Sequence, residues 1–271
     1  MKKGGLRQQK FEEVRRMATA QALAAGMINV SSVIVFFAFA SNITGHFAIL
    51  AQELSKGNWF QAAVAVVWLS LFFFGNFVAN LFIVHKVGRL KRKRRANIPL
   101  LIEAVGLVMV GVYLQFYYSE TLAETEFLVG SLLFIMGLQN GHSAGLSGFS
   151  VKTTHLTGLT TDLGVLLAMF TKKRNRANQS LVERCRLSFR IMGSYVIGGI
   201  LGGVSYHLIG AGLFYIVALL LLGVILYPVI LSYSSNLIRS RGLEAERQSL
   251  AGVSVDKKST LNNKRDIPAA A

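Results

Sequence analysis

The chain alternates between long apolar segments and short polar ones. Six segments hold about 20 or more mostly apolar residues, the length that an α-helix needs to cross the hydrocarbon core of a bilayer. These segments are residues 18–40, 59–84, 98–118, 127–148, 187–207 and 211–233. The pattern predicts an all-α integral membrane protein with six transmembrane helices.

Two of the connections between these segments are themselves partly apolar. Residues 41–58 read SNITGHFAILAQELSKGN, and residues 149–171 contain TTHLTGLTTDLGVLLAMF. In each connection a polar Thr-Gly start precedes an apolar stretch that is too short to span a bilayer. Such stretches are typical of re-entrant or interfacial helices, and we expect one in each connection.

The two halves of the chain share a short pattern. The sequence GMIN, which ends at Asn29, is echoed by GLQN, which ends at Asn140. A Thr-Gly pair follows each asparagine, at Thr44-Gly45 and at Thr157-Gly158. Each half, 18–118 and 127–233, then holds three spans. An odd number of spans per half reverses the second half, which predicts a three-plus-three inverted repeat.

Charge fixes the expected orientation. The chain is 52% hydrophobic and only 15% charged, yet its formal net charge is +16. Its basic residues cluster in 1–17, in 86–95, in 172–190 and in the polar tail 235–271. These clusters fall on alternate connections, so the positive-inside rule places them and both termini in the cytoplasm.

The clustering also defines the expected surroundings of the protein. It favours a lipid bilayer, with anionic lipid at the basic loops, over nucleic acid as the partner. We expect a multi-pass protein of the plasma (inner) membrane whose residues 235–271 are disordered. A homo-oligomer is compatible with the pattern.

Two longer stretches resemble a known family. AAGMINVSSVIVFFAFASNITGHFAILAQELSKGNW and GLQNG followed by VKTTHLTGLTTDLG are similar to the two signatures of the YoaK-like bacterial membrane proteins, a family of unknown function. The resemblance covers roughly residues 15–235 and implies an integral inner-membrane protein without an established substrate. The chain departs from the family at Asn29, where an acidic residue is usual, and at His46, where asparagine is usual.

A G-x-S-x-G pattern, the sequence of a nucleophile elbow, lies at Gly141–Gly145. An elbow needs a strand, a turn and a helix, but the preceding segment is long enough to be a membrane span. Asp162 and His207 follow in the order of a catalytic triad. The predicted topology, however, separates them by about 30 Å of helix. We therefore predict no enzyme and no catalytic residue.

We interpret the G-x-S-x-G stretch as a break in a membrane helix in which Ser143 is a small filler. The alternative is that its small residues let two helices approach closely.

Several polar residues within apolar segments are candidates for binding a solute. A threonine can cap a short helix and leave backbone N–H groups that attract an anion, although plain capping is an alternative. The candidates for binding substrate are Asn29, Thr44, Gly45, His46, Asn140, His142, Thr157 and Gly158.

Other polar or small residues have a structural interpretation. Asn76 and Asn80 lie four residues apart on one helix face and are expected to bond between helices. Glu103 follows a helix start and the basic pair Arg94 and Arg95, which should stabilise its charge. Glycines of the fifth span, together with Ser194, form a close-packing face, either within the chain or between two copies: they include Gly198 and Gly202.

The function predicted from these features is transport or permeation of a small solute. The alternative is a non-transporting scaffold or regulator that binds anionic lipid or a cytoplasmic partner. Cys185 is the one cysteine, and no paired histidine motif or phosphate-binding loop is present, so no metal or cofactor is expected.

Overall fold

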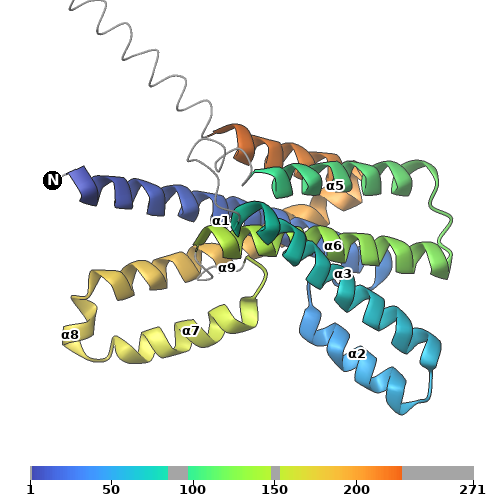
Figure 1. Cartoon of the computed structure of the whole chain (residues 1–271), viewed down its shortest axis with the longest axis horizontal. Helices are drawn as coiled ribbons and strands as arrows, with labels where there is room; N and C mark the ends of the chain where they lie inside the picture. Colours follow the sequence, from blue (N-terminus) through green and yellow to red (C-terminus); the bar gives the residue numbers. More distant parts are fainter. Residues whose placement is uncertain (1, 85–96, 148–152, 228–271) are drawn as a thin grey trace, which may run out of the picture. The chain divides into compact units, whose positions relative to one another are not determined.

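The computed structural model describes residues 2–84, 97–147 and 153–227, and every regular element among them is an α-helix (Figure 1). The chain divides into two units, Met1–Ile225 and Leu226–Ala271, and the contacts given below all lie within the first. Its helices are α1 (Lys2–Phe36), α2 (Ile43–Ser55), α3 (Trp59–Val84), α5 (Ile98–Phe116), α6 (Leu122–Ser147), α7 (Leu156–Met169), α8 (Lys173–Arg176) and α9 (Gln179–Ile209). A further helix, Gly212–Tyr227, follows α9.

Five of these helices are long and apolar enough to cross a bilayer: Arg15–Phe36, Trp59–Val84, Ile98–Phe116, Leu122–Leu146 and Gln179–Ile209. Large apolar side chains on them face outward, as at Phe73 of α3, which is 69% exposed. In water such surfaces would promote aggregation, whereas in a bilayer they face lipid. The molecule is therefore a multi-pass membrane protein, as predicted.

The sixth predicted span is described only in part. The helix Gly212–Tyr227 is too short to count as a span, and residues 228–233 lie outside the described residues. The predicted disordered tail, 235–271, and the whole basic cluster 86–95 also lie outside them. A six-span count thus stays a prediction.

The first helix begins and ends earlier than the apolar pattern predicts. It starts at Lys2, so the predicted N-terminal segment 1–17 is helical over its described part, and it ends at Phe36 rather than at residue 40. The end has a local cause, because Phe37 adopts a φ of 54°, outside the right-handed helical region. The Ser32 hydroxyl then donates to the carbonyl of Ala38 (2.7 Å) and holds the chain as it turns back.

The helix break expected at Gly141–Gly145 does not occur. Helix α6 runs without interruption from Leu122 to Ser147, and α1 likewise continues through Asn29. The expectation rested on the low helix propensity of glycine and serine. Tertiary packing overrides that propensity, because the glycines of α6 lie against another helix.

Helices α3 and α6 cross in backbone contact. A Cβ atom added to Gly137 would lie 2.2 Å from the carbonyl oxygen of Phe72, and one added to Gly75 would lie 2.2 Å from that of Phe134. One turn further along α6, a Cβ atom on Gly141 would lie 2.7 Å from the carbonyl oxygen of Asn76. Only glycine fits such a crossing, so the alternative interpretation of the G-x-S-x-G stretch, close helix approach, holds.

Helices α1 and α9 cross in the same way. A Cβ atom on Gly26 would lie 2.0 Å from the carbonyl oxygen of Tyr195, and one on Gly198 would lie 2.0 Å from that of Leu23. A Cβ atom added to Gly202 would lie 2.6 Å from the Cα of Met27. The close-packing face predicted on the fifth span therefore packs within the chain, against α1.

The two crossings correspond residue by residue. Gly26 and Gly137 are 111 positions apart, as are Leu23 and Phe134, while Gly75 and Gly198 are 123 positions apart. Tyr195 is the backbone partner of Gly26 and Phe72 is that of Gly137, and these two partners also differ by 123 positions. The pair α1 and α9 thus repeats the contacts of the pair α6 and α3.

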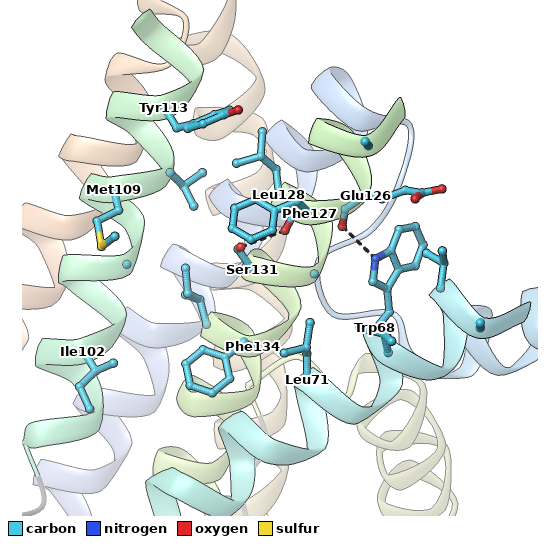
Figure 2. Close-up of a pocket in the computed structure, with 18 of the residues that line it drawn as sticks. Trp68, Leu71, Ile102, Met109, Tyr113, Glu126, Phe127, Leu128, Ser131 and Phe134 are labelled. Carbon is cyan, nitrogen blue, oxygen red and sulfur yellow. Dashed lines mark hydrogen bonds between the residues drawn. The ribbon is translucent and has the colours of Figure 1, made fainter. Parts of the chain in front are cut away.

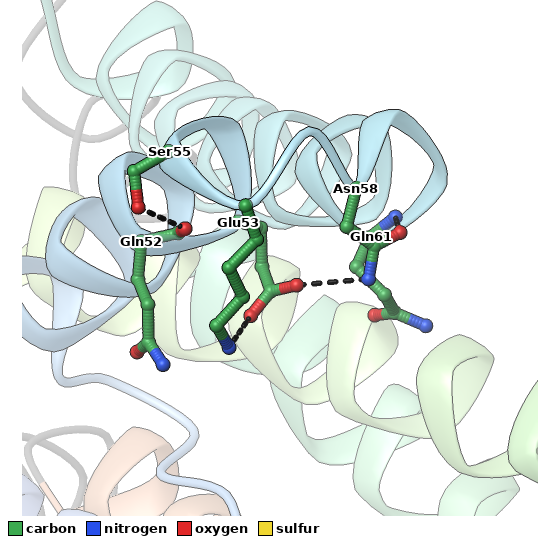
Figure 3. Close-up of polar contacts among 6 residues, drawn as sticks. Gln52, Glu53, Ser55, Asn58 and Gln61 are labelled. Carbon is green, nitrogen blue, oxygen red and sulfur yellow. Dashed lines mark hydrogen bonds and ion pairs between the residues drawn. The ribbon is translucent and has the colours of Figure 1, made fainter.

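The two short helices predicted in the connections are present as α2 and α7. Helix α2 is joined to α3 by a tight turn in which Gly57 has a φ of +70°. Figure 3 shows that the Glu53 carboxylate organises this turn by accepting from Lys56 Nζ and from Asn58 Nδ2, each at 2.8 Å. In turn, Asn58 Oδ1 accepts from the backbone N–H of Gln61 (3.3 Å) at the start of α3.

Candidate functional site

The first candidate site lies where α1 turns into α2, and we call it the first junction: Asn29, Ser41 and Asn42. Asn29 is buried in α1, where its Nδ2 donates to the carbonyl of Ala25 (2.9 Å) and its Oδ1 accepts from Ser41 Oγ (3.0 Å). The next residue, Asn42, is the N-cap of α2, and its Oδ1 accepts from the backbone N–H of Gly45 (3.1 Å). A buried amide therefore fixes the point at which the short helix begins.

The second junction, Asn140, Thr154 and His155, lies where α6 leads into α7. Asn140 is buried, its Nδ2 donates to the carbonyl of Met136 (3.0 Å), and its Oδ1 accepts from Thr154 Oγ1 (2.9 Å). His155 is the N-cap of α7. The two asparagines make the same pair of hydrogen bonds, one to their own helix and one to the residue before an N-cap.

The threonines of the Thr-Gly pairs do not cap these helices, so that expectation was wrong. Thr44 and Thr157 are the second residues of α2 and α7, and both side chains are exposed. The chain enters each helix two residues earlier, because the preceding hydroxyl group is held by the buried asparagine.

The glycine of each Thr-Gly pair makes room for the cap. A Cβ atom on Gly45 would lie 2.7 Å from Asn42 Nδ2, and one on Gly158 would lie 2.3 Å from His155 Nδ1. The N-cap side chain folds over the first turn of the helix at both places. The feature that the two Thr-Gly pairs share is therefore steric: in each pair the glycine leaves room for the N-cap side chain.

A buried polar contact joins the two halves of the chain beside the second junction. Gln21 of α1 donates through Nε2 to Nδ1 of His142 in α6 (2.8 Å), and Gln139 Nε2 donates to the backbone carbonyl of Gln21. All three side chains are at most 1% exposed. The sequence pattern indicated His142 as a candidate but did not indicate the two glutamines. The signal that could have found them is a long amide side chain inside a predicted span.

The structure does not bring Asn29 and Asn140 into contact. Helices α1 and α6 run in opposite directions (Figure 1), and Gln21 lies opposite Gln139 and His142. Asn29 is eight residues beyond Gln21, so it lies about 12 Å along the helix axis from the level of Asn140. The two junctions therefore occupy different depths in the protein.

A family model described as a protein of unknown function (DUF1275) matches residues 17–227. The chain belongs to the DUF1275 family. No curated protein and no solved structure matches the chain. Both junctions and the Gln21 contact lie inside the DUF1275 region, whereas the YoaK-like assignment made from the two signatures stays an interpretation.

His46 of the DUF1275 region closes the loop before α2. It is 3% exposed, its Nε2 donates to the carbonyl of Phe39 (2.9 Å), and its ring meets that of Trp68 edge to face with centroids 5.3 Å apart. Burial lowers the pKa of His46 below its ordinary value of 6.5, and the bond to Phe39 opposes this only in part. The folded protein therefore holds His46 neutral where the unfolded chain already takes up a proton.

We expect His46 to make the protein less stable in mild acid. Since the unfolded state binds more protons than the folded state below pH 6.5, the free energy of unfolding falls as pH drops through that value. His46→Gln keeps a donor for Phe39 but does not titrate, so its Tm should depend less steeply on pH. Melting both proteins in detergent between about pH 5 and pH 8 measures the difference. Equal slopes would contradict the assignment to His46.

The predicted polar face of α3 packs against α6, but the expectation that Asn76 and Asn80 bond between helices was wrong, because their hydrogen bonds lie within α3. Asn80 Nδ2 donates to the backbone carbonyl of Asn76 (3.0 Å) and to its Oδ1 (3.1 Å). A Cβ atom on Gly145 of α6 would lie 2.7 Å from Asn80 Oδ1. Ser143 of α6, in the G-x-S-x-G stretch, donates to the carbonyl of Asn140 (3.1 Å). These groups stabilise the α3–α6 crossing and the start of the second junction.

A cavity of about 790 Å³ lies between α3, α5 and α6, away from both junctions (Figure 2). Its walls are almost entirely apolar, with Leu71, Met109 and Phe134 among them, and at one end Trp68 Nε1 donates to the carbonyl of Glu126 (3.0 Å). In a bilayer this cavity suits a lipid chain better than a polar solute. Among the described residues, no three His, Cys, Asp or Glu side chains are grouped to hold a metal ion.

Proposed function

We propose that this DUF1275 protein is an inner-membrane transporter or permease for a small solute, built from two inverted three-span halves. Both termini would lie in the cytoplasm, with the basic loops against anionic lipid. We assign no catalytic role to Ser143 and no cofactor. The proposal rests on the correspondence between the halves and on what lies buried where they meet.

The correspondence of the two helix crossings supports the inverted repeat. In α1 and α9 the contacts advance together along the chain, from Leu23 with Gly198 to Met27 with Gly202, so the two helices run in the same direction. Helices α3 and α6 are parallel for the same reason. With α1 opposed to α6, spans one and five then point one way and spans two and four the other. That order is the one required if α2 and α7 do not cross the bilayer.

The observation that carries the transport proposal is the pair of equivalent junctions. A buried amide in the apolar interior is costly unless it has a partner or a function. Here Asn29 and Asn140 each hold the residue that precedes the N-cap of a short helix. Helices that start within the membrane present free N–H groups to a solute, a recurrent arrangement in secondary transporters built from inverted repeats.

The separation of the junctions suggests how a solute would pass. With about 12 Å between their levels, one junction serves each side of the centre. A rocking motion of the halves would open first one junction and then the other. The contact between Gln21 and His142 lies between the halves and would be remade during this motion.

Double replacement of Asn29 and Asn140 by alanine tests the proposal. We expect loss of solute flux in proteoliposomes, because the residue before the N-cap of each short helix loses its anchor. Flux is measured by stopped-flow light scattering with urea and glycerol, and by solid-supported membrane currents with chloride, acetate and ammonium. The wild type must first show flux above that of empty liposomes for at least one of these probes.

Two further variants separate function from folding. Asn29→Asp retains an acceptor for Ser41 and should retain flux, whereas Asn58→Ala removes an exposed asparagine from the α2–α3 turn and should have no effect on it. All variants are compared by elution profile and Tm. Unchanged flux in a well-folded double variant rules out the junctions as the pathway. A wild-type protein that shows no flux for any probe favours the alternative function, a non-transporting scaffold or regulator.

A further inference from the structure

One buried carboxyl group takes no part in the junctions. Glu103 lies in the second turn of α5, its side chain is 0% exposed, and neither carboxyl oxygen has a hydrogen-bond partner among the residues that the structure describes. Arg94 and Arg95, which the sequence suggested as its partners, lie outside those residues. A fully buried acidic side chain in a membrane-spanning helix needs a counter-charge.

The surroundings of Glu103 are apolar. Leu100 and Leu107, one turn to either side on the same face of α5, belong to the main hydrophobic cluster together with Ala104. Helix α3, which packs on α5, carries no ionisable side chain. Tyr215 of the last helix bonds to Gln115, near the other end of α5. No described cation therefore neutralises Glu103.

Helix α6 carries a buried amide side chain, that of Gln139, near the level of this carboxyl group. A Cβ atom on Gly106 of α5 would lie 2.9 Å from Cδ1 of Ile135 in α6, which fixes the register of these antiparallel helices. One turn back along α5 is Glu103, and one turn forward along α6 is Gln139. This register places the two residues at about the same level of the α5–α6 pair. His142 is the ionisable residue of α6 closest in sequence to Gln139, whereas Glu124 and Glu126 lie at the far end of that helix.

Gln139 has an acceptor to offer at this level. Its Nε2 donates to the backbone carbonyl of Gln21, but its Oε1 is buried and has no donor among the described residues. Three oxygen atoms, two from Glu103 and one from Gln139, are thus buried without a donor in the part of the chain that the structure describes. Such a set of oxygen ligands suits a hard cation, as in the ion sites of membrane transporters.

We propose that Glu103 and the amide oxygen of Gln139 form an intramembrane site for a small monovalent cation, either a proton or sodium. The cation would neutralise the carboxylate that the apolar surroundings otherwise disfavour. If the proposed transport function holds, this cation is the coupling ion. The site itself can be tested without any solute, so its failure is distinguishable from failure of the transport proposal.

Covalent labelling with dicyclohexylcarbodiimide tests the site. This apolar reagent reacts with protonated carboxyl groups in apolar surroundings, and mass spectrometry of the α5 peptide reports the adduct. We expect Glu103 to be labelled in the purified wild-type protein at mildly acidic pH. Glu103→Gln should lose the adduct completely, while Glu126→Gln, which changes a carboxyl group at the end of α6, should leave it unchanged.

The two candidate cations give different results. If sodium binds, sodium chloride should slow the labelling of Glu103 relative to choline chloride at the same pH. Gln139→Leu, which lacks the amide oxygen, should lose that protection. If the site takes a proton, labelling should fall as pH rises and be equal in the two salts. Either result supports the proposal.

Three outcomes would overturn it. Glu103 could remain unlabelled at acidic pH, as expected for a carboxylate held in an ion pair by an arginine. Its labelling could be independent of both pH and sodium. Labelling could also fall on Glu124 or Glu126 and not on Glu103. Because labelling reads the site directly, each result is informative whether or not the protein transports any of the tested solutes.

Discussion

Gly198→Ala is expected to destabilise the protein severely. The added methyl group would lie 2.0 Å from the carbonyl oxygen of Leu23, and a backbone atom cannot rotate away as a side chain can. Helices α1 and α9 would have to separate along their crossing. Overpacking of this kind costs about 1–3 kcal/mol or more. The loss is measured as a fall in Tm in detergent, on purified protein that elutes as a single species.

Gly193 provides a matched control in the same helix. It is exposed, and nothing lies within 4 Å of an added Cβ atom. Gly193→Ala should leave the Tm unchanged or raise it, since alanine is favoured over glycine inside a helix by about 0.5–1 kcal/mol. If the two variants melt alike, the backbone contact between α1 and α9 does not carry stability.

Gly137→Ala is expected to have the second large effect, at the corresponding crossing of α3 and α6. Its methyl group would lie 2.2 Å from the backbone oxygen of Phe72, so the reason is the same as for Gly198. We expect a loss of about 1–3 kcal/mol in detergent, measured as a fall in Tm. A similar loss for both variants would support the correspondence between the two crossings.

A graded control lies two turns before Gly137 in α6. A Cβ atom on Gly130 would come 2.9 Å from Cδ1 of Leu71, the end of a flexible side chain that can move aside. Gly130→Ala should therefore cost much less than Gly137→Ala. If Gly130→Ala proves as harmful, the losses reflect glycine flexibility in α6 and not the close backbone contact.

The G-x-S-x-G stretch shows that a local sequence pattern alone does not predict the structure of a segment. The sequence offered a nucleophile elbow, a helix break or a packing face for Gly141–Gly145. Helix propensity favoured the break, but Gly141 lies against the backbone of Asn76 in a continuous helix. The local preference of a residue could not decide, because the partner helix is more than sixty positions away in the sequence.

The sequence by itself determined the features that depend on the length and periodicity of apolar segments. It predicted the all-helical membrane class, the bounds of α3 at Trp59–Val84 and the two short helices, because the bilayer sets a minimum length for a span. It also predicted equivalent positions for Asn29 and Asn140, since a repeated pattern at a constant offset does not require knowledge of contacts.

The tertiary structure alone decided which residues meet. It placed the N-caps of α2 and α7 at Asn42 and His155, because the buried asparagines hold the hydroxyl groups just before them. It assigned the glycines of α6 and α9 to helix crossings, joined Gln21 to His142, and left Glu103 buried without a partner among the described residues. These outcomes depend on the register of helices that are distant in the chain, and register is fixed by the shapes of both partners, which a pattern along one segment does not contain.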